Sequence, residues 1–161
     1  MRRPTVRGGR GFTLIELVIT VAIVGLLASA AYPLAELAAT RARERELQAA
    51  LREIRAGIDA YKRAADEGRV AKAVNESGYP KSLSLLYRGV ADPKRGDKAM
   101  IYFMRRLPRD PFAAGTLAAE DTWGLRSYAS SPDWPSEGED VFDVYSRASG
   151  VGLNGLAYRD W

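Results

Sequence analysis

Residues 7–33 form the stretch RGGRGFTLIELVITVAIVGLLASAAYP, in which a basic, glycine-rich start passes directly into an apolar run. No charged side chain occurs between Leu17 and Ala35. At about 1.5 Å per helical residue, this segment is close to the thickness of the hydrocarbon core of a bilayer. Basic residues ahead of a membrane span stay in the cytoplasm, so the bulk of the chain is expected in the periplasm of a Gram-negative cell. These basic residues are Arg2, Arg3, Arg7 and Arg10.

One carboxylate, Glu16, interrupts the apolar start. A charge at bilayer depth costs about 2.5 kcal/mol or more unless it is paired. A secretory signal peptide also has a basic start and an apolar run, and residues 28–30 (Ala-Ser-Ala) would then be its cleavage site. In an ordinary membrane anchor, Glu16 would instead extend toward the membrane edge. Neither alternative gives the carboxylate a partner.

The quoted stretch resembles the leader and amino-terminal segment of type IV pilins and type II secretion pseudopilins. The resemblance implies that a prepilin peptidase cuts between Gly11 and Phe12 and that Phe12 is then N-methylated. Glycine suits such a cut because a residue without Cβ lets a protease approach the backbone. The cut creates an amine one helical turn from Glu16, which gives the carboxylate a cationic partner. The resemblance places that pair between neighbouring subunits of a filament.

Pro33 lies near the end of the apolar run. A proline inside a helix removes a backbone donor and clashes with the preceding turn, so the helix should kink or loosen near Tyr32. In the pilin family, a proline at this place accompanies a stretch that melts on filament assembly. Alternatively, Pro33 marks the exit from the membrane. We expect residues 1–11 to be a removed leader and residues 12–35 to be a transmembrane and polymerisation helix, with Glu16 and Pro33 as its assembly residues.

The chain has 161 residues with 24 basic and 20 acidic side chains, which suggests an anionic partner. Four of the basic residues precede Phe12, however, and the rest of the chain is balanced at 20 of each sign. We therefore expect no nucleic-acid partner. The chain has no cysteine and no histidine, which excludes disulfides, thiolate metal sites and the commonest general base. We expect no catalytic residues, and an enzyme carried on a signal anchor is the alternative class.

Beyond Pro33 the sequence is amphipathic and predicts that the helix continues over residues 36–68, with a stop near Gly68. Docking of its apolar face onto the chain's own sheet is the favoured interpretation, and a coiled-coil seam is the alternative. The apolar stripe consists of Leu47, Leu51, Ile54, Ile58, Tyr61 and Ala65. The charged residues expected on the outer face, against solvent or neighbouring subunits, are Arg41, Arg43, Glu44, Arg45 and Glu46.

Residues 69–161 are rich in turns and predict a small head. Gly78-Tyr79-Pro80 indicates a turn into a short helix with Ser82 as its cap. Two prolines keep LPRDPF (107–112) extended. SYASS (127–131) and VFDVYSR (141–147) have the composition of short antiparallel strands. The predicted fold class is α+β and pilin-like: a long N-terminal helix, transmembrane in its first half and amphipathic in its second, on a loop-rich head with a short antiparallel sheet.

Short motifs of the head resemble, in chain order, those of the G-type subunit, the major pseudopilin of type II secretion. The resemblance implies a structural subunit that polymerises with itself, anchored by a single span in the inner membrane. It implies as partners a prepilin peptidase, minor pseudopilins, an inner-membrane assembly platform and a secretion ATPase. A type IV pilin or minor pilin, for adhesion, motility or DNA uptake, is the alternative, and the lack of a cysteine pair argues mildly against it. The motifs are GYP and the following SL element (78–83), LPRDPF, Trp123-Gly124 with Tyr128, and FDVYS (142–146); residues 113–122 are an insertion that departs from the pattern.

The resemblance also implies calcium, which G-type pseudopilins bind near the C-terminus through carboxylate and carbonyl oxygens, the ligands this hard ion prefers. Here Ser149-Gly150 stands where the first calcium aspartate is expected. Asp160 matches the second aspartate by position, and Asn154 supplies another oxygen. One carboxylate makes a weak calcium site. The alternative is a glycine-rich loop held by hydrogen bonds and by the packing of Tyr158 and Trp161.

Overall fold

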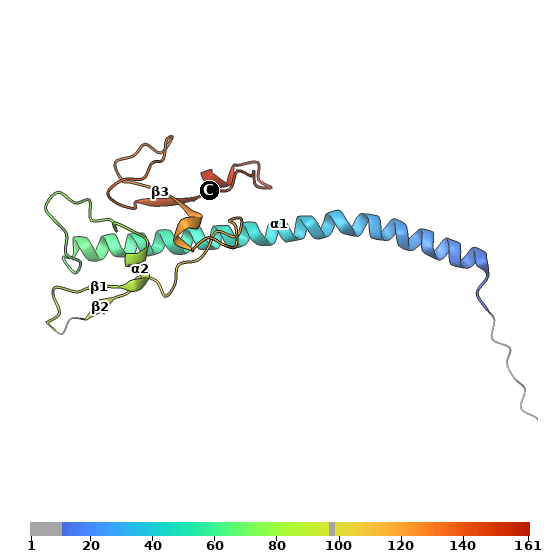
Figure 1. The fold of residues 1–161 in the computed structure, drawn as a ribbon, viewed down its shortest axis with the longest axis horizontal. Helices are drawn as coiled ribbons and strands as arrows, with labels where there is room; N and C mark the ends of the chain where they lie inside the picture. Colours follow the sequence, from blue (N-terminus) through green and yellow to red (C-terminus); the bar gives the residue numbers. More distant parts are fainter. Residues whose placement is uncertain (1–10, 97–98) are drawn as a thin grey trace, which may run out of the picture. The chain divides into compact units, whose positions relative to one another are not determined.

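The computed structural model describes residues 11–96 and 99–161, and the chain divides into two compact units, Met1–Thr40 and Arg41–Trp161. One helix, α1 (Leu14–Asp66), runs through both units (Figure 1). Besides its part of α1, the described head contains two short antiparallel pairs of strands and one short α-helix. The predicted α+β class, with a long N-terminal helix and a small head, is confirmed.

In the first unit, the described part is almost entirely α1. By length and composition, this helix is apolar enough to cross a membrane. The helical assignment continues through Pro33 without a break. A proline in a helix interior costs about 3 kcal/mol, so the surrounding leucine and alanine residues, which are strong helix formers, must offset that loss.

The second unit is built on the C-terminal part of α1. All six residues of the predicted apolar stripe are buried there, and none is more than 7 % exposed. They pack in one core with residues contributed by the head, including Leu86, Trp123 and Val144. Full burial of a large apolar side chain contributes about 1.5–3 kcal/mol. The head therefore covers the apolar stripe, as predicted. These turns of α1 expose no apolar face that could pair with a second helix in a coiled coil.

Helix α1 ends close to the predicted stop. Gly68 has φ +69°, the left-handed conformation that glycine adopts without strain. The N–H of Arg69 donates to the carbonyl of Ala64 at 2.8 Å, and the N–H of Gly68 donates to that of Ala65 at 3.0 Å. These two bonds form a Schellman motif, which satisfies the last carbonyls of the helix.

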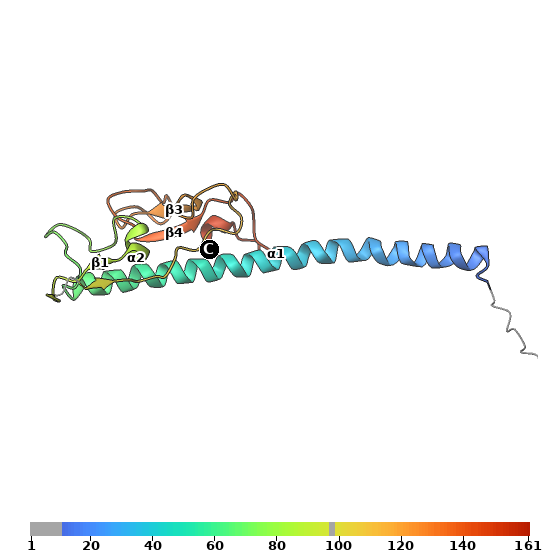
Figure 2. The same cartoon turned by 60° about the horizontal axis from the view of Figure 1, so that its bottom comes forward.

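The two strand pairs lie on different sides of α1 within the head. β1 (Val90–Ala91) pairs with β2 (Met100–Ile101), and β3 (Trp123–Arg126) pairs with β4 (Asp143–Ser146). Figure 1 shows β1 and β2 below the helix and β3 above it, and Figure 2 keeps β3 and β4 above it. The β1–β2 pair was not predicted from the sequence.

The strand expected at SYASS (127–131) is wrong, whereas the strand expected within VFDVYSR (141–147) is present as β4. The strand is the preceding WGLR segment, in register with β4 from Trp123 opposite Ser146 to Arg126 opposite Asp143. Residues 127–131 instead contain a turn in which the N–H of Ser130 donates to the carbonyl of Ser127 at 3.1 Å. The two prolines of the following segment cannot donate to a ladder, which favours a turn there.

The short helix after Gly78-Tyr79-Pro80 is present as α2 (Ser84–Arg88), but its cap differs from the prediction. Leu83 is the N-cap residue, and no side chain caps the helix. The Ser82 hydroxyl instead lies 2.7 Å from the Ser84 hydroxyl. Two single 3-10 turns complete the head, η1 (Glu120–Thr122) and η2 (Tyr158–Asp160).

Glu44 also differs from its prediction. It is 9 % exposed, whereas the neighbouring charged residues of the group are exposed. A buried carboxylate is stable only when it is paired or hydrogen-bonded. Its partners therefore identify which part of the chain covers this turn of α1.

Candidate functional site

The start of α1 carries a reciprocal pair of side-chain caps. The backbone N–H of Thr13 donates to Oε2 of Glu16 at 2.9 Å, and the Thr13 hydroxyl donates to the same oxygen at 2.8 Å. In return, the N–H of Glu16 donates to Oγ1 of Thr13 at 3.3 Å. This is a capping box, in which a threonine and the glutamate three residues later satisfy free N–H groups of the first helical turn. Thr13 was not among the predicted site residues, although the Thr-x-x-Glu spacing predicts a capping box.

The capping box leaves Glu16 with a second, unused oxygen. Oε1 has no hydrogen-bond partner among the described residues. The Glu16 side chain is exposed, and Phe12 is 86 % exposed at the same end of the helix. The structure thus brings the two predicted residues to one helix end and leaves an oxygen of Glu16 available to a cation from outside the subunit.

The predicted cleavage position precedes the helix. Gly11 and Phe12 have no regular structure and are exposed, and no atom of the described residues lies within 4 Å of the place a Cβ would occupy on Gly11. An open, non-helical peptide suits entry into a protease active site, because the backbone must be extended to be cut. The leader residues 1–10 lie outside the described residues.

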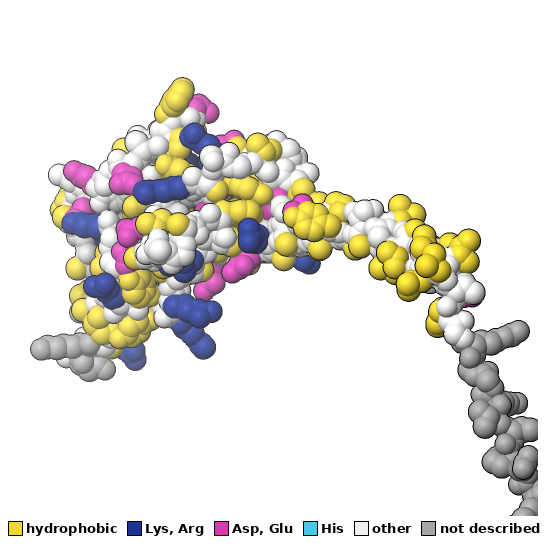
Figure 3. Space-filling view, turned by 45° about the vertical axis from the view of Figure 1, so that its right-hand side comes forward, with side chains coloured by type: hydrophobic (Ala, Val, Ile, Leu, Met, Phe, Trp, Pro, Cys, Tyr) yellow, Lys and Arg dark blue, Asp and Glu magenta, His cyan; other side chains and the backbone are white. Residues whose placement is uncertain are grey.

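An apolar surface continues from Phe12 to Leu34. Its large side chains are all more than half exposed. Figure 3 shows hydrophobic side chains gathered along this part of α1. The Thr20 hydroxyl donates to the carbonyls of Glu16 and Leu17 at 2.8 Å, and the Ser29 hydroxyl donates to that of Leu26 at 2.7 Å. Because these hydroxyls are satisfied within the helix, they add little polarity to its surface. A helix that is apolar all round is covered by lipid or by other helices.

The two residues expected to bind calcium are not arranged as a calcium site. Oδ1 of Asn154 accepts the N–H of Leu156 at 3.0 Å and so closes its own loop. Asp160 is exposed, with Oδ1 at 3.7 Å from Nε of Arg159. Among the described residues, no three acidic, histidine or cysteine side chains are grouped to hold a metal ion. Calcium takes six to eight oxygens, usually from several carboxylates. One carboxylate beside an arginine does not fit that requirement.

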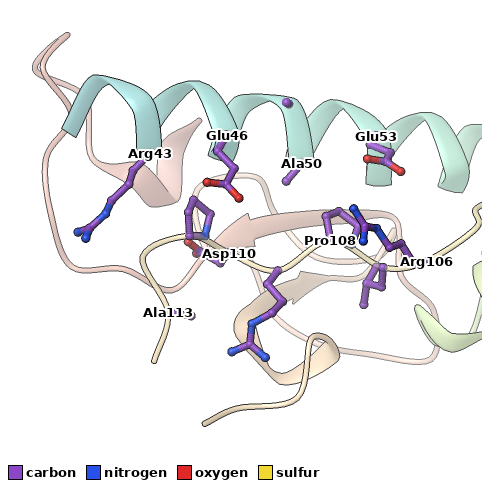
Figure 4. Close-up of a pocket in the computed structure, with 12 residues that line it drawn as sticks. Arg43, Glu46, Ala50, Glu53, Arg106, Pro108, Asp110 and Ala113 are labelled. Atoms are coloured by element: carbon purple, nitrogen blue, oxygen red, sulfur yellow. The ribbon is translucent and has the colours of Figure 1, made fainter. Parts of the chain in front are cut away.

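The head also contains a groove of about 620 Å³ between α1 and the LPRDPF segment (Figure 4). Its charged lining comes from both sides and includes Glu46 and Glu53 of the helix and Arg106, which directly precedes the segment. The buried Asp110 carboxylate is already occupied by the N–H of Phe112 at 2.8 Å and by the Ser146 hydroxyl. No described lining residue pairs a nucleophile with a base, so the groove offers no catalytic arrangement.

Residues 7–32 match the family described as the prokaryotic N-terminal methylation motif. The matched segment contains Gly11, Phe12, the capping box and most of the apolar surface. The motif indicates a type IV pilin-like prepilin signal, the kind that a prepilin peptidase processes, and it covers the start of a helix that by length and composition could cross a membrane. No curated protein and no solved structure matches the chain.

Proposed function

We propose that this chain is a structural subunit of a type II secretion pseudopilus. A prepilin peptidase removes residues 1–11 on the cytoplasmic side of the inner membrane and methylates Phe12. Residues 12–35 then hold the subunit in the membrane until it enters the filament. The observation that carries the proposal is Glu16, a carboxylate with one unused oxygen, one turn from Phe12 and directly before the uncharged stretch of residues 17–35 in α1.

Polymerisation exchanges contacts with lipid for contacts between helices. In that apolar interior an unpaired Glu16 is unfavourable, because the surroundings cannot solvate its charge. The amine created at Phe12 of a neighbouring chain supplies the missing cation. Oε2 of Glu16 caps its own helix, so Oε1 is the oxygen that receives this amine. A subunit that inserts at the wrong height leaves both charges unpaired, and the pair therefore sets the axial register.

The other segments follow from this arrangement. Residues 36–68 carry the helix from the membrane into the head, and residues 69–161 form the periplasmic head. Pro33 loosens the helix near the membrane exit as the filament forms. The inner-membrane platform, the secretion ATPase and the minor pseudopilins complete the machinery, and filament growth pushes folded proteins toward an outer-membrane channel. The resemblance of the head motifs supports this choice of system.

Two matched variants test the role of Glu16. Glu16→Gln removes the charge but keeps a side chain that can serve in a capping box. Thr13→Ala removes the hydroxyl of the capping box but keeps the charge. We expect Glu16→Gln to insert and be cleaved normally while forming no filaments, and Thr13→Ala to retain them, as measured by electron microscopy and by shear release of filaments.

Normal filament yield from Glu16→Gln would contradict the proposed charge pair. Equal losses in the two variants would assign the effect to the helix cap. Neither result is expected if the carboxylate pairs with the amine of another subunit.

A type IV pilin or minor pilin is the second candidate. The absence of any cysteine argues mildly against it, because a cysteine pair is common in the C-terminal region of such pilins. Deletion of the gene in its host separates the two functions. Retention of exoproteins in the periplasm, with surface pili intact, supports secretion; loss of pili, twitching or DNA uptake, with normal secretion, supports the pilin.

A further inference from the structure

We propose that the carboxyl-terminal segment of the head is fastened to α1 by Glu44 and Arg55, and that the head therefore needs no calcium. This segment, residues 150–161, has little regular structure of its own. It contains one bridge, between Val151 and Ala157, and the single turn η2. Such a segment needs attachment to the rest of the head, and the family resemblance implies that a metal ion provides it. In this chain, the side chains of Glu44 and Arg55 on α1 attach the segment instead.

Glu44 provides the first attachment. Its Oε1 accepts the backbone N–H of Leu153 at 2.7 Å and the hydroxyl of Tyr158 at 3.1 Å. Both donors come from the carboxyl-terminal segment, more than 100 residues away along the chain. Hydrogen bonds to an ionised group are stronger than those between neutral groups. The pKa of Tyr158 is raised, first by burial and then by its bond to Glu44, which keeps the phenol protonated as a donor.

Arg55 provides the second attachment, three turns further along the helix. Its Nε donates to Oδ1 of Asp143 at 2.7 Å. Its Nη2 donates to the carbonyl of Val144 at 3.1 Å and to the backbone oxygen of Trp161 at 2.8 Å. One cation thus binds a carboxylate and two backbone oxygens. These are the oxygens with which proteins coordinate calcium, and a guanidinium binds them in a fixed planar geometry.

Aromatic packing closes the same segment against the head. Tyr158 stacks on Phe112 with ring centroids 4.3 Å apart, and it meets Trp161 edge-on at 5.2 Å. The Trp161 ring lies over Gly152, where an added Cβ would come within 2.4 Å of Cζ2. The glycine therefore makes room for the ring. Hydrogen bonds from α1 and ring contacts from the head hold the segment from two directions.

The test is hydrogen exchange of the full chain in detergent, followed by mass spectrometry on peptides covering residues 150–161, in millimolar calcium and in excess EGTA. We expect the wild-type chain to exchange at the same rate in both solutions. Glu44→Ala and Arg55→Ala should exchange several-fold faster in both. Glu46→Ala and Arg52→Ala are the matched controls, because these exposed neighbours on α1 have no ion pair among the described residues, and they should behave as wild type.

Slower exchange of the wild type in calcium, lost in Asp160→Asn, would overturn the proposal by restoring the metal site. Exchange of Glu44→Ala and Arg55→Ala at the control rate would overturn it by removing the fastening. If either variant fails to fold, Tyr158→Phe deletes one bond to Glu44 while keeping the ring and should still accelerate exchange. The calcium comparison needs only the wild type, and every arm is independent of whether the subunit enters a pseudopilus or a pilus.

Discussion

Glu16 has two carboxylate oxygens, and only one of them has a partner among the described residues of the subunit. One oxygen completes the capping box with Thr13, which satisfies the first turn of its own helix. The other oxygen has no partner among the described residues, and Phe12 precedes Glu16 by four positions at the same end of the helix. A carboxylate that satisfies the subunit with one atom can bind a neighbouring subunit with the other. In the proposed filament, the capping box would orient Glu16 and leave its second oxygen for the amine of the neighbouring subunit.

The ionised Asp66 side chain at the end of α1 should make the stability of the fold depend on pH in acid. Its carboxylate accepts hydrogen bonds from Nζ of Lys62 at 2.6 and 2.7 Å and from Nζ of Lys72 at 3.2 Å. These hydrogen bonds lower the pKa of Asp66 below its ordinary value of 3.8, and the bond from Lys62 has the larger effect. A carboxyl whose pKa is depressed on folding stabilises the fold above its ordinary pKa, and that contribution is lost as the pH falls through the folded-state pKa.

Asp66→Asn should therefore make the loss of stability in acid shallower, and at neutral pH it should lower stability slightly. The effect is small because Asp66 is exposed. The measurement is the denaturant midpoint of the full chain in detergent, followed between roughly pH 5 and pH 2. Parallel pH profiles for the variant and the wild type would show that the two lysines do not stabilise the ionised form.

The periodicity of the sequence predicted correctly which residues of the α1 stripe are buried, but it did not predict the burial of Glu44. The buried stripe repeats every three or four residues, and Glu44 lies three residues before Leu47, so it continues the same face. Its charge alone placed it outside. A charged residue can occupy a buried stripe when specific donors reach it, and those donors, Leu153 and Tyr158, are too distant in sequence for any local pattern to reveal.

At the scale of elements, only one strand of the β3–β4 pair was predicted from the sequence. Strand β4 was predicted, and strand β3 was not. Composition favoured SYASS, and Gly124 lowers the strand propensity of WGLR. Gly124 lies opposite Tyr145 in the ladder, and an added Cβ would come within 2.3 Å of that ring. The tyrosine ring covers the glycine. The glycine is therefore required by a pairing that the sequence does not show, and local propensity gave the wrong segment.

This contact makes a direct prediction. Gly124→Ala should lower the free energy of unfolding by about 1–3 kcal/mol, the usual cost of forcing an extra group into a packed site. In a Tyr145→Ala background, the same substitution should cost much less, because the ring that it meets is gone. Urea unfolding of the four chains measures the coupling. Equal costs in both backgrounds would show that the ring does not exclude a side chain at position 124.

At the scale of the whole molecule, the core and the apolar surface are separate in sequence. Every residue of the buried core cluster lies between Leu47 and Tyr158, within the unit Arg41–Trp161. The large exposed apolar side chains from Phe12 to Leu34 lie in the other unit. The chain thus keeps the residues that fold its head apart from those that require lipid or another helix.

A fragment comprising Arg41–Trp161 should therefore fold without detergent and remain a monomer. Its α1 segment should give a helical circular dichroism spectrum, and the packed aromatic residues should give a near-ultraviolet signal. Light scattering coupled to gel filtration measures its mass. The chain beginning at Phe12 should need detergent under the same conditions. An unfolded or aggregated fragment would show that the head depends on the apolar part of α1.

The long helix, its membrane-compatible start and its buried stripe were predictable because each depends on neighbours three or four residues apart. The capping box could also have been predicted from the sequence, because Thr13 and Glu16 have the required spacing. The β1–β2 pair and the fastening of the carboxyl-terminal segment were not, because their partners come from distant parts of the chain. The resemblance implied a weak calcium site at Asp160 and Asn154, and among the described residues no three acidic, histidine or cysteine side chains are grouped to hold a metal ion.

The most direct test of the central claim is the mass of the chain made with and without a prepilin peptidase. We expect the peptidase to remove residues 1–11 and to leave a chain that begins at Phe12 and carries one N-terminal methyl group. Without the peptidase, the leader should remain. An intact N-terminus in both samples, or cleavage after Ala30 in either, would contradict the claim that this chain is processed for assembly into a filament.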